Sequence, residues 1–333
     1  MHLPTCTTLS RSLPRPSRRT LFAASATLML SAVTPKAFAL ADDDVNCASP
    51  VVAADQGTQR ILLLGDDGSG TGTARVQWSW SPLSDKHLAD LSPSRTWRNV
   101  SEAKMRALGG RKMLLASASE GLAAVLTYPG AAVQWATVVP SLNVHSLELL
   151  PDGNVALAAS NPGVVRVYAA TRGARSKEFA AFNLAGAHGV YWDGRRRLLW
   201  AVGDSRLIAL EVTGPAHSPR LSLARSVTLP DPSGHDLDLV AGSPGRMWVT
   251  TGDHVLQYDP DCGQFVDYDG QAAIDISDVK SVGDDPATGR VLTFRPESGN
   301  ACAWCGSTVA LHLPSGSLRL PGARLYKARW SLP

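Results

Sequence analysis

Three histidines recur at nearly regular intervals along the chain. His145 and His188 are 43 residues apart, and His188 and His235 are 47 residues apart. Neutral imidazole is a common ligand of transition metals, and its pKa suits acid or base catalysis near neutral pH. Because the three recur in step, we expect them to meet at one site, as metal ligands or as catalytic acid and base groups.

Charged residues continue the same spacing on both sides of the histidines. Glu102 lies 43 residues before His145, Lys280 lies 45 residues after His235, and Lys327 follows Lys280 by 47 residues. Cations gathered at one place can hold a carboxylate, sulfate or phosphate. The residues expected to form this anion clamp are Lys104, Lys280, Lys327 and Arg329.

Further ionisable residues complete the predicted site. Glu102 is expected to act with the histidines, either by orienting a lysine or by accepting a hydrogen bond from a substrate hydroxyl. Asp236 and His254 are expected to bind ligand. If the three histidines converge, they could hold one divalent ion, Mn²⁺, Zn²⁺ or Ca²⁺, with Asp236 or a water completing the coordination. Two other interpretations remain open: an anion pocket without metal, and a purely structural ring whose polar groups are satisfied internally.

The elements that must position these residues are short strands in a repeat of 43 to 47 residues. Each repeat has apolar strands joined by tight turns, such as 151–154 (Pro-Asp-Gly-Asn) and 192–195 (Trp-Asp-Gly-Arg). These turns are typical of β-hairpins, and no repeat carries a sustained helical period. Repeats of this length, each of four strands, predict an all-β fold, the β-propeller.

The number of blades follows from the ends of the chain. Five repeats span 101–325, and strands at 51–56, 60–64 and 74–80 supply three strands of another. Its missing innermost strand is expected at 325–330. We therefore predict a six-bladed β-propeller over 51–333 as a single domain, closed by a C-terminal strand that joins the N-terminal blade and removes the free edges. The innermost strands line the channel, so the recurring residues should meet at its mouth.

The first 39 residues resemble an export signal. Arg18 and Arg19 precede an apolar stretch of 13 residues, 21–33, which is too short to span a bilayer, and residues 37–39 (Ala-Phe-Ala) fit a cleavage site. The paired arginines resemble a twin-arginine signal, and residues 40–50 then form a short N-terminal segment. Removing 1–39 takes away five cations and no acid, and the net charge changes from +3 to −2.

The mature chain should therefore lie in the periplasm or outside the cell, with no membrane span. Nucleic acid is not an expected partner, because no basic stripe remains. Four cysteines remain in this chain, where oxidation favours disulfides. Their pairing is open between Cys47, Cys262, Cys302 and Cys305, although a local Cys302–Cys305 bridge is favoured.

Five ordered motifs resemble a known family. They stand at 143–153, 187–193, 234–237, 279–281 and 326–330. They are similar to a domain-of-unknown-function family of secreted bacterial and fungal six-bladed propellers. The resemblance implies the fold and export, but it implies no activity.

These observations lead to two hypotheses of different class. The first is a monomeric, exported propeller that binds a small anionic ligand or oligosaccharide, of the carbohydrate or uronate kind, at the channel mouth. Such a protein could be a metal-assisted lyase or hydrolase acting on anionic sugars. The alternative is a non-enzymatic scaffold that binds a ligand or a protein on its rim through aromatic residues, with Trp78, Trp80, Trp97 and Trp135 as candidates.

Overall fold

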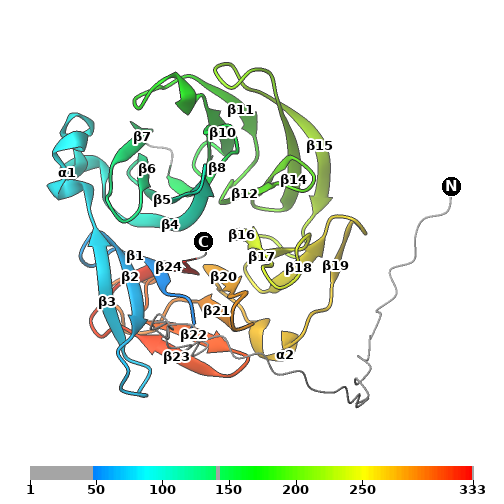
Figure 1. Ribbon diagram of the computed structural model, residues 1–333. Helices are drawn as coiled ribbons and strands as arrows, with labels where there is room; N and C mark the ends of the chain where they lie inside the picture. The colour runs from blue at the N-terminus through cyan, green and yellow to red at the C-terminus, as the bar shows by residue number, and fades with distance from the viewer. Residues whose placement is uncertain (1–47, 140–142, 332–333) are drawn as a thin grey trace, which may run out of the picture. The chain divides into compact units, whose positions relative to one another are not determined.

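A computed structural model describes residues 48–139 and 143–331 of the chain. The predicted export signal, residues 1–39, and Cys47 lie outside these ranges. Within them, six four-stranded antiparallel sheets are arranged in a ring, and their innermost strands face a common central axis, called the channel below (Figure 1). The prediction of a six-bladed β-propeller is confirmed. Among the described residues, no helix is long and apolar enough to cross a membrane.

The first three blades come from the N-terminal half of the described chain, apart from one C-terminal strand in the first blade. The first contains β1 (Val51–Asp55), β2 (Arg60–Asp66), β3 (Ala74–Trp80) and β24 (Leu325–Trp330). The second contains β4 (Val100–Leu108), β5 (Arg111–Ala118), β6 (Leu122–Thr127) and β7 (Val133–Val138). The third contains β8 (Val144–Leu149), β9 (Val155–Ala159), β10 (Val164–Tyr168) and β11 (Phe179–Asn183).

The remaining blades repeat this plan. The fourth contains β12 (Gly189–Asp193), β13 (Leu198–Val202), β14 (Arg206–Thr213) and β15 (Arg220–Thr228). The fifth contains β16 (Asp236–Leu239), β17 (Met247–Thr250), β18 (Val255–Asp259) and β19 (Gln264–Val266). The sixth contains β20 (Ser281–Asp284), β21 (Val291–Phe294), β22 (Thr308–His312) and β23 (Gly316–Arg319). Short helical turns lie in the connections: 82–84, 86–91, α1 (Pro93–Thr96), 170–172 and α2 (Gln271–Ile274).

The ring closes where the two ends of the described chain meet. β24 pairs antiparallel with β1, with Trp330 opposite Val51 and Ala328 opposite Ala53. Ser281 of β20 ties the sixth blade to this strand, because its hydroxyl donates to Ala328 O at 2.9 Å and accepts from Ala328 N at 3.0 Å. The innermost strand of the first blade is therefore supplied by the C-terminal segment, as predicted.

Apolar side chains fill the spaces between blades. Trp80 and Trp97 pack edge to face at 5.5 Å between ring centroids, and Trp135 packs on Tyr168 at 5.1 Å. All three tryptophans are buried, so they stabilise the blades and cannot serve a rim site. The Cys302–Cys305 disulfide lies in the connection between β21 and β22.

Candidate functional site

The three recurring histidines meet at one end of the channel. The rings of His145 and His188 stack with centroids 4.1 Å apart, and those of His188 and His235 lie 4.7 Å apart. Tyr326, from the closing strand β24, joins them: its hydroxyl lies 3.2 Å from His145 Nδ1 and 3.2 Å from His235 Nε2. We call this end of the channel the histidine end.

The backbone has a common conformation just before the inner strands of four blades. The residue two positions before each of His145, His188, His235 and Lys280 has a left-handed conformation: Asn143 (φ 52°), Gly186 (φ 62°), Ser233 (φ 65°) and Asp278 (φ 64°). Asn, Asp and Gly adopt this conformation most readily. At His145 a β-bulge adds a further change, because the register with β9 shifts between Val144 and Ser146. Bulges of this kind re-aim a side chain.

Hydrogen bonds fix the protonation pattern of His188. Its Nδ1 lies 2.8 Å from the carbonyl oxygen of Gly186. A carbonyl can only accept, so Nδ1 carries the hydrogen and donates it. Burial, together with the nearby cations Lys327 and Lys280, outweighs this bond and lowers the pKa of His188 to about 4. At neutral pH the ring is therefore neutral, and Nε2 is a hydrogen-bond acceptor.

The other two histidines are also neutral. Burial, and next the neighbouring His188, hold the pKa of both His145 and His235 well below the usual value. Burial raises the pKa of Tyr326, so its hydroxyl stays protonated. The Nδ1 atom of His235 is buried without a hydrogen-bond partner. An unpaired buried lone pair is less costly than an unpaired N–H, which favours the tautomer in which His235 Nε2–H donates to Tyr326 and Tyr326 donates to His145 Nδ1.

A pocket of about 480 Å³ opens above the histidines. His145, His188 and Tyr326 form part of its wall, and Lys280 contributes its cation. Trp304, from the disulfide-bonded connection, is 46% exposed, and its Nε1 donates to Gln56 Oε1 at 2.9 Å. The carboxamides that line the pocket are those of Gln56, Asn99, Asn143 and Asn161, and Ser119 and Glu120 complete the lining.

Below the histidines the channel is filled by buried ion pairs. Arg329 donates to Glu102, Asp236 and Asp238, and Arg106 donates to Glu148 and Asp238. This ion-pair cluster contains four bases and four acids: Lys104, Arg106, Lys327, Arg329, Glu102, Glu148, Asp236 and Asp238. Its formal charge is therefore balanced. Residues of the cluster also line a pocket of about 470 Å³ at the opposite mouth.

The cluster explains where most of the predicted anion clamp lies. Lys104 lies 3.5 Å from Glu148, Lys327 lies 3.2 Å from Asp236, and Arg329 lies 3.0 Å from Glu102. These three cations are buried, and each already has an internal acidic partner. Glu102 and Asp236 serve as those partners, and nearby cations, Arg329 foremost, overcome the effect of burial and lower the pKa of Glu102.

Two predicted residues lie elsewhere. Lys280 lines the histidine-end pocket, where its Nζ is 2.7 Å from Asp278. His254 is half exposed and lies 3.1 Å from Asp275, outside the lining of that pocket. Lys280 is thus the one member of the predicted clamp that reaches the pocket wall in the described part of the chain.

The rings of His145 and His188 are stacked, and the ring of His235 is tilted against His188. Stacked rings direct their nitrogens along nearly parallel planes, whereas metal ligands direct lone pairs to one point about 2 Å away. Within residues 48–139 and 143–331, no three His, Cys, Asp or Glu side chains are grouped so that they could hold a metal ion. The divalent ion expected from the histidine spacing stays a prediction, and this geometry lends it no support.

Sequence reasoning missed the aromatic and amide parts of the pocket. Tyr326 directly precedes Lys327 in the closing strand, so its place at the histidine end could have been found from the repeat. Asn99 and Gln56 also lie beside repeat strands. Trp304 gave no such signal, because it lies in a connection with no counterpart in the other blades.

Comparisons with known proteins identify a family and leave the activity open. The pattern of a family of unknown function, DUF6528, matches residues 32–333. No curated protein matches the chain. A crystal structure of a protein of unknown function from Bacteroides caccae is similar with a TM-score of 0.49 and 13% identity, over 79% of this chain and 89% of that one. A chain of a mitotic checkpoint complex gives a TM-score of 0.44 and 10% identity, over 86% and 84%.

Proposed function

We propose that this chain, which belongs to the family of unknown function DUF6528, is an exported ligand-binding propeller. Its ligand is a small hydroxylated acid of the uronate class, bound in the histidine-end pocket. The observation that carries the proposal is the lining of that pocket, which combines four carboxamides, one exposed indole and one lysine.

Each part of the lining fits one part of such a ligand. A carboxamide both donates and accepts, as a sugar hydroxyl does, so the two pair in either direction. The Trp304 indole is held by its bond to Gln56 and offers an apolar face to the C–H face of a sugar ring. Lys280, whose ion-pair partner Asp278 is itself 54% exposed, supplies a cation for the carboxylate, and His188 Nε2 accepts from a hydroxyl.

The protonation of the histidines favours binding over proton abstraction. A catalytic base works best when its pKa lies near the working pH. The pKa of His188 is lowered to about 4, which makes the ring a weak base but leaves it a good hydrogen-bond acceptor. We therefore place binding ahead of the lyase or hydrolase activity that the histidine spacing led us to consider.

Export is part of the same proposal. Residues 1–39 have the layout of a signal sequence, and the Cys302–Cys305 disulfide suits an oxidising compartment. This disulfide lies directly beside Trp304. An oxidised periplasm or exterior would thus keep the pocket in its described form.

Replacing Trp304 with alanine is expected to weaken binding of galacturonate or glucuronate about tenfold, because the apolar platform is lost. Isothermal titration of each purified protein with the two uronates measures this change. Phe179→Ala is the matched control, since Phe179 is 45% exposed and lies outside the pocket lining. Equal affinities of Trp304→Ala and the unmodified protein would contradict the proposed site.

Replacing Lys280 tests independently whether the pocket recognises the carboxylate of the ligand. Lys280→Met is expected to abolish the preference for glucuronate over glucose while leaving the weaker glucose binding unchanged, because only the carboxylate uses the cation. Competition titrations with the two sugars measure the preference. A preference that survives the substitution would remove Lys280 from the site.

A further inference from the structure

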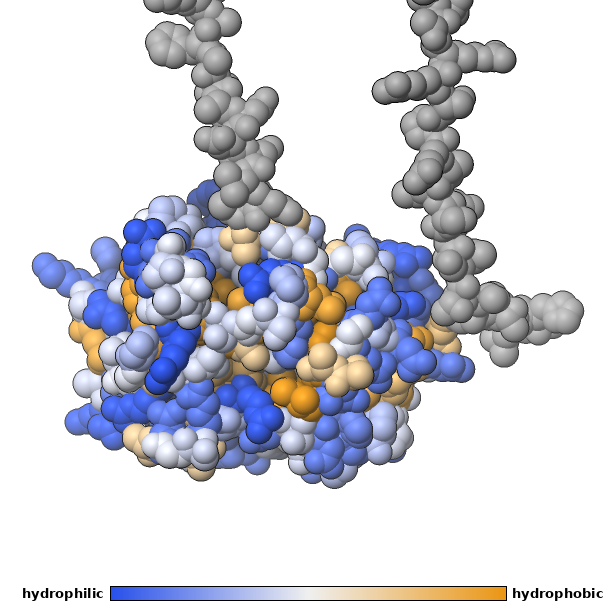
Figure 2. Space-filling model, turned by 90° about the horizontal axis from the view of Figure 1, so that it is seen from below, coloured by the Kyte–Doolittle hydropathy of each residue, from blue (hydrophilic) through white to orange (hydrophobic). Residues whose placement is uncertain are grey.

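A second pocket lies at the seam where the first and sixth blades meet. Its volume is about 700 Å³, and it shares no lining residue with the histidine-end pocket. Its walls come from β1, β2 and β3 on one side and from β22 and β23 on the other. On the edge of the ring formed by these blades, Figure 2 shows hydrophobic residues at the surface between hydrophilic ones. We call this cavity the seam pocket.

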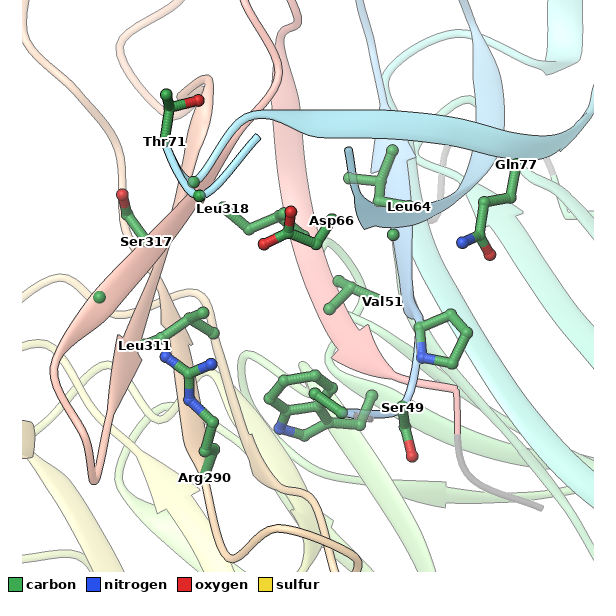
Figure 3. Close-up of a pocket in the computed structure, with 17 residues that line it drawn as sticks. Ser49, Val51, Leu64, Asp66, Thr71, Gln77, Arg290, Leu311, Ser317 and Leu318 are labelled. Atoms are coloured by element: carbon green, nitrogen blue, oxygen red, sulfur yellow. The ribbon is translucent and has the colours of Figure 1, made fainter. Parts of the chain in front are cut away.

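The seam pocket presents one unpaired charge of each sign. Figure 3 shows Asp66 of β2 and Arg290, which precedes β21, projecting into it from different blades. Neither forms an ion pair with another described residue. The Arg290 guanidinium donates one long bond, from Nη2 to Pro314 O at 3.4 Å, and its Nε is buried without a partner. Asp66 Oδ1 accepts from Gly68 N at 2.7 Å, which leaves Oδ2 available.

Two glycines leave space for the polar side chains of Arg290 and Gln77. A Cβ at Gly316 would lie only 2.9 Å from Arg290 Nη2, so a larger residue there would displace the guanidinium. A Cβ at Gly65 would likewise clash with the carboxamide of Gln77, another lining residue. The backbone thus leaves room for polar side chains at the pocket wall.

Apolar side chains form another part of the wall, beside the polar side chains of Ser49, Thr71, Gln77 and Ser317. Leu311 and Leu318 lie along the sixth-blade side, and Val51 and Leu64 along the first-blade side (Figure 3). Burying an apolar group against such walls is favourable in proportion to the area removed from water. A ligand that combines an apolar body with both a cation and an anion would match these parts of the wall.

We propose that the seam pocket binds a small zwitterion with apolar side chains, of the dipeptide class. The ligand carboxylate lies on the planar guanidinium of Arg290, which suits bidentate pairing. The ligand ammonium lies on the carboxylate of Asp66, and the side chains pack on the leucines. The volume lies in the range of pockets that enclose ligands of this size, and the balanced charges of the wall match the zero net charge of the ligand.

Titration with leucyl-leucine and its two capped forms tests this proposal. N-acetylation removes the ammonium, and C-terminal amidation removes the carboxylate. Each cap is expected to weaken binding about tenfold or more, the effect of one charge-assisted hydrogen bond. Glycyl-glycine, which keeps both charges without the side chains, is expected to bind more weakly than leucyl-leucine.

Variants assign each charge to its residue. Arg290→Gln should weaken the binding of leucyl-leucine about tenfold. It should not weaken the binding of the amidated peptide further, because that peptide already lacks the carboxylate that pairs with Arg290. Asp66→Asn should weaken the binding of leucyl-leucine but not that of the acetylated peptide, which already lacks the ammonium that pairs with Asp66. Arg75→Gln and Asp67→Asn, which alter neighbouring residues outside the lining, should bind as the unmodified protein does, and circular dichroism checks that all variants fold.

A variant of the histidine-end pocket shows whether the two sites bind their ligands independently. Trp304→Ala should leave dipeptide binding unchanged, whether or not it alters uronate binding. Capped peptides that bind as tightly as free leucyl-leucine, or saturable binding that neither Arg290→Gln nor Asp66→Asn reduces, would overturn the proposal. A lack of saturable binding of leucyl-leucine to the unmodified protein would overturn it as well.

Discussion

Replacing Arg329 with methionine is expected to lower the free energy of unfolding by about 3–5 kcal/mol. Arg329 donates to Glu102 and to Asp236 inside the channel. Both carboxylates are fully buried, so the substitution leaves them without their strongest partner. Removing one member of a buried ion pair is costly mainly because the remaining charge is desolvated and uncompensated. Urea-induced unfolding at neutral pH measures the change.

Arg195→Met is the matched control for this prediction. Arg195 forms an ion pair with Asp261 at 2.9 Å, but its side chain is 63% exposed. Exposed ion pairs contribute at most about 1 kcal/mol. A loss of the same size in Arg195→Met and Arg329→Met would mean that the ion-pair cluster does not have the buried, tightly paired character described above.

The protein is expected to lose stability steeply as the pH falls from about 6.5 toward 5. The pKa of His188 is lowered to about 4 in the folded state, and those of His145 and His235 are also well below 6.5. Between the folded and unfolded pKa values the unfolded chain takes up protons that the native protein excludes. Each histidine therefore contributes full stability above pH 6.5 and loses about 1.4 kcal/mol per pH unit below it. Together the three give roughly 4 kcal/mol per unit at the steepest point.

Unfolding curves at several pH values between 7.5 and 5 measure this slope. His188→Gln should reduce the change of unfolding free energy with pH by about 1.4 kcal/mol per pH unit. His217→Gln, at an exposed position, should leave this pH dependence unchanged. Equal stability at pH 7.5 and pH 5.5 would show that the three imidazoles are not held neutral by burial.

The fold could be predicted from the sequence because the repeat is regular in both length and turns. Spacings of 43 to 47 residues and the lone strand at 325–330 were enough to derive the six blades and their closure. The recurrence of the histidines likewise indicated one end of the channel, since each stands at the start of an inner strand or directly before it.

The electrostatics of the channel could not be predicted in the same way. Lys104 and Arg329 looked like free cations, because the sequence does not show which acids face them across the ring. Their partners Glu148 and Asp238 each follow a recurring histidine by three residues. At His145 a bulge changes which side chains of the strand point inward, and local pattern does not reveal such a shift. Trp304 cannot be predicted from the repeat, because the connection that carries it occurs in one blade only.

The most direct test of the histidine-end site is the side-chain ¹H–¹⁵N spectrum of the histidines during titration with galacturonate. Before ligand is added, His188 should show the tautomer with hydrogen on Nδ1, as its bond to Gly186 requires. As the ligand saturates the pocket, the His188 Nε2 resonance should shift, because in the proposed site that atom accepts a hydrogen bond from the ligand. The resonance of exposed His217 should stay in place. Saturation of the protein by galacturonate without any change at His188, or no saturable binding at all, would contradict the proposed binding site.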